Sequence, residues 1–480
     1  MSAASPPGPL HGLARSDDTG PTDPAASIEA LTLRMADLCA GAVDSFEVVA
    51  GLEADGINDE VAGRYGHPHV FALAQVLYQR TERRPGVPAP PPDPWTGQVW
   101  RQLLRGVLFG LPGLCYATAA PAPARPGGSV VLLLSLLLSW SVSQGVAYLA
   151  YVRLGQGDRT AAARVMRHGL TAAGLIVPPI VALAAVLLDV GTPVTVLALG
   201  QCVYLLAATA ALVGGAEPWL LLALLPGAAA STAQLAGAQI RPVVWVAWAV
   251  TVAATVGLAV ACTAASDGAR SPRDSGQSRA DVTTALPYAL FGLLAGGLLT
   301  FSAVPALLGL TRPSQATSVA VVALSLSMGF AEWILLGYRR RLRRVSLTRS
   351  SLGSFALVAR VALVAAIAGY LFALMALAAA IAVPAGLVGG LHWGPAAPWI
   401  AGGHLCLGGA FFVALLLQSS GRSRARMRMV LIAFTAALTT EAVASSIGDP
   451  WVVQCAAAAM LFGVLCTYAL VVLAKATPHR

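Results

Sequence analysis

The chain contains 480 residues, of which 57% are hydrophobic and only 11% are charged. A soluble domain carries about 25% charged residues, which cover its core with polar surface. This composition therefore excludes the water-soluble enzyme classes and disordered proteins, and predicts an all-α protein that crosses a membrane many times. The net charge of +9 is divided unevenly: residues 1–101 hold 13 acidic and 7 basic residues, whereas the rest holds 9 acidic and 24 basic residues. The arginines are spread over loops without interleaved aromatic residues, so no nucleic-acid partner is expected.

The acidic N-terminal region is predicted to lie in the cytoplasm. Residues 1–22 have the composition of a disordered segment. Residues 23–84 are predicted to form a small helical module, with one helix from Pro24 to Leu52 whose apolar residues recur every three or four positions, followed by two shorter helices. Residues 85–101 form a linker with six prolines. A module of about 60 residues is marginally stable alone, so we expect it to bind a cytoplasmic protein partner.

The remainder of the chain is predicted to contain twelve membrane-spanning helices, since a bilayer core requires about 20 apolar residues per helix. They form a first lobe (residues 102–265), a cytoplasmic inter-lobe loop (266–285), a second lobe (286–475) and a short cytoplasmic tail (476–480). The predicted spans are 104–120, 129–152, 168–188, 192–213, 218–239, 242–264, 286–310, 315–337, 353–383, 395–418, 428–447 and 451–474.

The distribution of basic residues predicts the orientation of these spans. With the N-terminus inside, the cytoplasmic loops and tail would contain 19 basic residues, and the outer loops only Arg125, Arg241 and Arg312. Basic residues concentrate on the cytoplasmic side of membrane proteins. We therefore expect a multi-pass protein of the cell (inner) membrane, embedded in the lipid bilayer, with both termini in the cytoplasm.

The two lobes carry a weak internal repeat. The run Leu-Phe-Gly-Leu begins at Leu108 and again at Leu290, 182 positions later. Two serines separated by one residue follow in the next span of each lobe, beginning at Ser139 and Ser325, 186 positions apart. Six spans per lobe place both lobes in the same orientation, so the sequence predicts parallel repeats related by an axis along the membrane normal, with a substrate bound between them.

The loop after the second span carries a motif formed by Gly155, Gly157, Asp158 and Arg159. It resembles the corresponding loop of the multidrug/oligosaccharidyl-lipid/polysaccharide (MOP) flippase superfamily. The resemblance implies two six-helix lobes that move a lipid-linked saccharide or another amphiphile by alternating access, for example in polysaccharide or cell-envelope synthesis. The source is expected to be a bacterium with a GC-rich genome, because 30 of the 31 basic residues are arginine and Ala, Gly, Leu and Val are abundant.

Two alternatives remain open at this point. A major-facilitator transporter also has twelve spans, but its motif after the second span has a glycine four residues before the aspartate, whereas Gly155 precedes Asp158 by three. A non-transporting membrane scaffold would gather partners through the N-terminal module. No catalytic motif and no metal-ligand spacing of cysteines occurs in the sequence, so neither enzymatic activity nor a cofactor or metal is expected.

Polar groups inside membrane spans are the candidate functional residues, because they are costly there. Glu332 and Arg360 lie at similar depths in two consecutive spans, and we expect them to form an ion pair that acts as a fixed clamp, a gate or a proton-coupled site. Arg360 is taken as the single clear intramembrane arginine, and Glu217 as a loop residue. The remaining candidates for the substrate pathway are His404, Gln144, Gln234 and Glu441.

Overall fold

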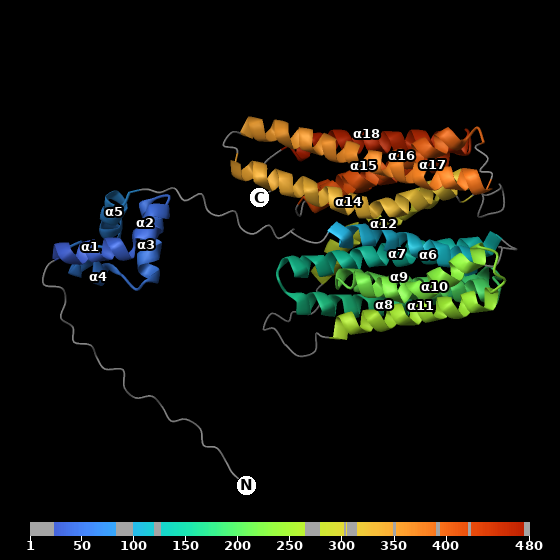
Figure 1. Cartoon of the computed structure of the whole chain (residues 1–480), viewed down its shortest axis with the longest axis horizontal. Coiled ribbons are helices and arrows are strands. Elements are labelled where there is room, and N and C mark those ends of the chain that lie inside the picture. The colour runs from blue at the N-terminus through green and yellow to red at the C-terminus, as the bar shows by residue number, and fades with distance from the viewer. Residues whose placement is uncertain are drawn as a thin grey trace, which may run out of the picture. The chain divides into compact units, whose positions relative to one another are not determined.

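The computed structural model divides the chain into two compact units, Met1–Pro94 and Trp95–Arg480 (Figure 1). All regular elements of the described part of the chain are helices. Residues 1–22, most of the predicted linker, the first part of the inter-lobe loop and the tail 476–480 lie outside that part. The structure describes residues 24–82, 99–119, 126–264, 279–301, 304, 314–348, 352–389, 394–420 and 424–474.

The N-terminal unit is a module of five short helices around its own apolar core. The predicted helix from Pro24 to Leu52 is divided into three, because the chain turns at Met35 and again before Ser45. Asp44, Asn58 and His69 cap the helices that follow them by accepting hydrogen bonds from backbone N–H groups. The helices are α1 (Pro24–Arg34), α2 (Ala36–Gly41), α3 (Ser45–Ala54), α4 (Asp59–Arg64) and α5 (Val70–Arg80).

In the second unit, the described residues form twelve long helices. Eleven of them are long and apolar enough to cross a membrane, which makes the chain a multi-pass membrane protein. The twelfth, α6, contains Arg101 and Arg105. The first six helices are α6 (Val99–Ala119), α7 (Pro126–Gly155), α8 (Arg159–Leu187), α9 (Thr192–Val213), α10 (Glu217–Leu235) and α11 (Arg241–Ala264). The second six are α12 (Arg279–Phe301), α14 (Gln315–Thr348), α15 (Leu352–Gly389), α16 (Ala397–Ser419), α17 (Arg424–Ala444) and α18 (Pro450–Val472).

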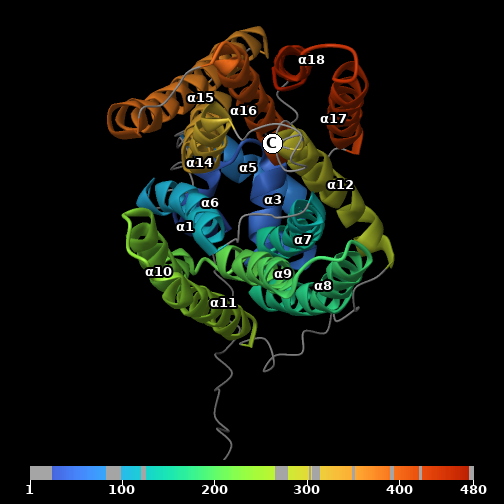
Figure 2. The same ribbon diagram turned by 90° about the vertical axis from the view of Figure 1, so that its right-hand side faces the viewer.

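The predicted repeat is confirmed by the order in which these helices pack. In the first six, α7 packs against α8 and α9, α9 against α11, and α10 against α11 and α6. In the second six, α14 packs against α15 and α16, α16 against α18, and α17 against α18 and α12. Each of these contacts in one group therefore has its equivalent in the other. Figure 2, which views the body along its helices, shows the two groups as separate lobes.

Two helix pairs join the lobes, and we call these contacts the seams. One seam is formed by α6 and α14, and the equivalent one by α7 and α12. The α6–α14 seam depends on glycine: a Cβ atom on Gly329 would lie 2.7 Å from the carbonyl oxygen of Gln102 and 3.0 Å from the Cα of Leu103. Small residues allow membrane helices to approach closely without a hydrophobic driving force. The close approach brings charged side chains of both lobes within reach of each other.

Candidate functional site: an ion network across the lobes

Four charged side chains meet where helix α6 enters the body. Arg101 and Arg105 lie one turn apart on α6 and point in the same direction, because residues four apart share a helix face. Glu217 is the first residue of α10, directly after a turn in which Gly215 has a φ of +74°. A carboxylate in the first turn of a helix is stabilised by the helix dipole. The turn therefore places the Glu217 carboxylate at the start of α10, next to the two arginines of α6.

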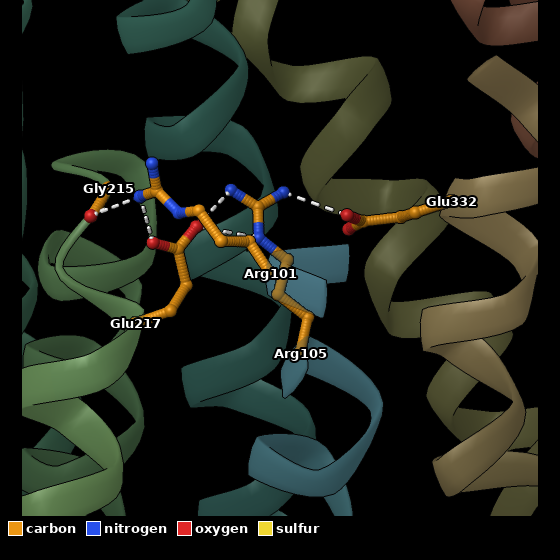
Figure 3. A network of polar contacts seen from close by, with 5 residues as sticks. All are labelled: Arg101, Arg105, Gly215, Glu217 and Glu332. Atoms are coloured by element: carbon orange, nitrogen blue, oxygen red, sulfur yellow. Dashed lines mark hydrogen bonds and ion pairs between the residues drawn. The ribbon is translucent and has the colours of Figure 1, made fainter. Parts of the chain in front are cut away.

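Both arginines bind Glu217 (Figure 3). Arg101 donates hydrogen bonds to the Glu217 carboxylate and to the carbonyl oxygen of Gly215. Arg105 donates to Oε1 of Glu217 from Nη2 at 2.7 Å and from Nε at 3.0 Å. Only 2% of the Glu217 side chain is exposed. This part of the network holds α10 to α6 within the first lobe and shields the Glu217 carboxylate from water.

Arg105 also reaches the other lobe. Its Nη1 donates a hydrogen bond of 2.9 Å to Oε2 of Glu332 on α14. About a quarter of each of these two side chains is exposed, at 25%. A partly hydrated ion pair contributes less than a buried one, and its loss is correspondingly less costly. The same guanidinium therefore makes one buried contact inside its own lobe and one partly exposed contact across the seam.

The other seam carries aromatic and neutral polar contacts. Tyr148 of α7 and Tyr288 of α12 stack with ring centroids 3.6 Å apart and an angle of 13° between the rings. The hydroxyl of Ser141 donates to the carbonyl oxygen of Ala289 at 2.8 Å. Ser141 lies near the middle of α7, and Tyr148 lies seven residues before its end at Gly155.

Comparison with known proteins gives one structural similarity. No protein-family model and no curated protein sequence matches the chain. Among solved structures, the chain is similar to the inward-facing conformation of a multidrug resistance MATE family transporter of the MOP superfamily. The identity is 12%, the TM-score is 0.43, and the alignment covers 78% of this chain and 99% of the other. That transporter belongs to the superfamily that the Gly155–Arg159 motif resembles.

The predicted ion pair between Glu332 and Arg360 is wrong. The two helices are neighbours, as expected, but Glu332 binds Arg105 instead. Arg360 is exposed on the same face of α15 as Leu357 and Val361, while Ala359 and Leu363 form the buried face. The prediction rested on the similar depth of the two residues in the membrane and did not consider in which direction each side chain points around its helix. Because α15 is apolar on all sides, its sequence does not indicate which face is buried.

Two further expectations need correction. Arg360 is not the single arginine within a predicted span, since Arg105 of α6 lies within the predicted span 104–120. Glu217 is not a loop residue, because it is buried and binds two arginines. The signal for Arg105 was a charge inside a predicted span. Arg101 lies at the end of the predicted linker, so the sequence does not mark it as a residue of the helix, whereas α6 begins at Val99.

The other candidate residues lie outside the network. His404 and Glu441 are buried in the second lobe, with 3% and 1% exposure, and Gln144 lies at the α7–α12 seam beside Gly292. Nδ1 of His404 hydrogen-bonds the carbonyl oxygen of Ile400 at 2.8 Å. Nε2 of His404, one carboxylate oxygen of Glu441 and the side-chain oxygen of Gln234 have no hydrogen-bond partner among the described residues.

The Gly155–Arg159 motif forms the turn between α7 and α8. Gly157 has a φ of +79°, a conformation that glycine adopts without steric cost. The Asp158 carboxylate caps α8 by accepting hydrogen bonds of 2.8 Å from the backbone N–H of Ala161 and from the hydroxyl of Thr160. These hydrogen bonds, the backbone one first, lower the pKa of Asp158. The motif thus makes a tight, well-capped connection at the basic end of the body.

Among the described residues, no group of three or more His, Cys, Asp or Glu side chains is placed to hold a metal ion.

Proposed function

We propose that the chain is a transporter that works by alternating access between its two lobes. The observation that carries the proposal is the ion pair between Arg105 and Glu332, which crosses a seam between two similarly built lobes. Repeats of this kind rock against each other around a central substrate site in many secondary transporters. In this proposal the Arg105–Glu332 pair is the latch of one seam, and the Tyr148–Tyr288 stack is the latch of the other.

The latches lie at the end of the body that we assign to the cytoplasm. Glu332 precedes the arginine cluster that begins at Arg339 by seven residues on the same helix, and Tyr148 lies seven residues before Gly155. Both positions lead to loops rich in arginine, which the positive-inside rule places in the cytoplasm. The structure would then represent a state that is closed toward the cytoplasm, in the inner membrane.

The arrangement is suited to a contact that opens and closes repeatedly. Separating the lobes breaks one partly exposed ion pair, and Arg105 keeps its hydrogen bonds to Glu217. A surface-like ion pair is worth about 1 kcal/mol or less, so the latch adds little to the barrier. A buried pair with no second partner would leave a charge uncompensated at a cost of about 3–5 kcal/mol.

The proposed substrate is a lipid-linked saccharide or another amphiphile, as the loop motif implies. Both arginines of the network are already paired with carboxylates. A polyanionic substrate requires free donors for its phosphates. The balanced charges therefore favour a substrate of low net charge over a polyanion.

Cysteine cross-linking tests the proposal. In a variant without the native cysteines, Tyr148→Cys and Tyr288→Cys are combined, and the protein is reconstituted into vesicles with a fluorescent lipid-linked saccharide and a fluorescent amphiphilic cation. Cross-linking should stop movement of the transported probe across the bilayer, and a reducing agent should restore it. The matched control joins two helices of one lobe, through Val146→Cys and Gly169→Cys, which are in contact, and should remain active when cross-linked.

Two outcomes would contradict the proposal. Transport that continues unchanged in the cross-linked Tyr148→Cys/Tyr288→Cys protein would show that the seam does not open. Absence of movement of either probe in the uncross-linked protein would favour the membrane scaffold.

A further inference from the structure

The N-terminal module displays a cluster of apolar side chains on its surface. Val43, Phe46 and Phe71 are 85%, 67% and 48% exposed. The ring of Phe71 packs edge-on against those of Phe46 and His69, with centroids 6.2 Å and 6.1 Å away. We call these four side chains the aromatic surface. Aromatic pairs of this geometry contribute to binding interfaces because they bury large areas with few rotatable bonds.

The backbone beneath the aromatic surface is held in place by three contacts. The N–H of Val43 donates to the Glu47 carboxylate at 2.9 Å, and its carbonyl oxygen accepts from the Tyr78 hydroxyl at 2.7 Å. Asp44 caps α3 through the N–H groups of Phe46 and Glu47, both at 3.0 Å. The exposed side chains therefore project from a fixed turn. A partner that binds a preorganised surface loses less conformational entropy.

The charge around the aromatic surface selects the kind of partner. Residues 24–82 contain nine acidic residues and three arginines. Asp44 and Glu47 lie directly beside Phe46 in the sequence and remain exposed. An anionic lipid surface or a second, equally acidic copy of the module would be repelled. Charge complementarity favours a basic partner.

We propose that the aromatic surface binds a basic amphipathic helix of a protein partner. The apolar face of that helix would cover Phe46 and Phe71, and its lysines or arginines would approach Asp44 and Glu47. Amphipathic helices bind apolar surfaces in this way, through anchor residues that recur every three or four positions. The proposal is independent of transport, since it concerns the module alone.

Photo-cross-linking with the full chain in zwitterionic nanodiscs tests the proposal. A photoreactive benzoylphenylalanine replaces Phe71, and the probe is a biotin-labelled 18-residue amphipathic peptide of lysine and leucine. The matched control places the same group at Leu33 of α1, which is 78% exposed. Position 71 should yield about tenfold more cross-linked peptide than position 33, which corresponds to roughly 1.4 kcal/mol of preference. An added Phe46→Ser substitution, or Asp44→Asn with Glu47→Gln, should reduce that yield.

Three results would overturn the proposal. Equal yields at positions 71 and 33 would show that the peptide reaches the module through the lipid or without specificity. If a peptide in which glutamate replaces lysine is cross-linked to position 71 with the same yield, charge does not contribute to binding. Cross-linking of position 71 mainly to a second copy of the chain would identify the surface as a self-association site.

Discussion

The two lobes have the same packing and different polar chemistry. The first lobe contributes Arg101, Arg105 and Glu217 to the ion network, and all three are paired. The positions 182 residues after the two arginines are Thr283 and Pro287, which carry no charge. The second lobe contributes Glu332 alone to the network. Both lobes also hold amide side chains with at least one buried polar atom for which the described residues offer no partner, Gln234 in the first and Gln454 in the second. Helix order is therefore preserved between the repeats, and the charges are not.

The difference shows which features the shared architecture requires. Both seams contain closely packed glycines, for example Gly329 in one and Gly292 in the other. The α6–α14 seam adds an ion pair, and the α7–α12 seam adds stacked tyrosines. Packing of small and apolar residues is sufficient to hold six helices together in lipid. Polar groups are not needed for that packing, so they can differ between the lobes without a change of fold. Four tests by substitution follow, in order of the expected effect on stability.

The largest expected effect is that of Glu217→Ala. It would leave Arg101 without its ion-pair partner and Arg105 with Glu332 alone, so we expect a loss of about 3 kcal/mol in the free energy of unfolding. Glu332→Ala is the matched control, because Arg105 keeps Glu217, and it should cost about 1 kcal/mol or less. Thermal and denaturant unfolding of the purified protein measure both. Equal losses would mean that the two contacts do not differ in burial.

The second effect concerns the glycine seam. Gly329→Ala places a methyl group against the backbone of α6, so the lobes must shift, at a cost of about 1–3 kcal/mol. Gly337→Ala on the same helix is the control, because a Cβ atom there meets nothing within 4 Å. It should raise stability by up to about 1 kcal/mol, since alanine favours helices. If Gly329→Ala is as harmless as Gly337→Ala, the α6–α14 contact is not tight.

The third test concerns a substitution that is expected to raise the stability of the protein. Gln454 is 2% exposed, and neither amide atom has a hydrogen-bond partner among the described residues. Gln454→Leu should therefore raise stability by about 1 kcal/mol, because the desolvated amide is removed. Ser141→Ala, which removes a satisfied hydrogen bond at the seam, should lower it by a similar amount. A destabilising Gln454→Leu would reveal a partner such as bound water.

The smallest effect is expected at the loop motif. Asp158→Ala should lower the melting temperature slightly at neutral pH, because it removes the cap of α8. The pKa of Asp158 is lowered in the folded protein, so its stabilisation is present above the ordinary pKa of aspartate, about 3.9. It is lost as the pH falls through the folded value. The difference in melting temperature between the two proteins should therefore shrink in acid, and a constant difference would contradict the hydrogen-bonded carboxylate.

The sequence was sufficient to predict the membrane class, the approximate positions of the long helices and the repeat. Apolar length defines each span locally, and α9 begins and ends as predicted, at Thr192 and Val213. The ion network could not be predicted in the same way. Arg105 lies 112 residues from Glu217 and 227 from Glu332, and pairing at that distance depends on how the lobes pack. Depth along a helix can be read from a sequence, whereas direction around an apolar helix cannot.

The length of α14 has a mechanical consequence. The helix continues for 16 residues beyond Glu332, to Thr348, which is about 24 Å at 1.5 Å per residue. If the lobes rock about their seams as proposed, that extension acts as a lever, so a small separation at Glu332 becomes a larger displacement at the tip. A spectroscopic label near the arginines of this extension would then follow the motion with greater amplitude than one at the latch.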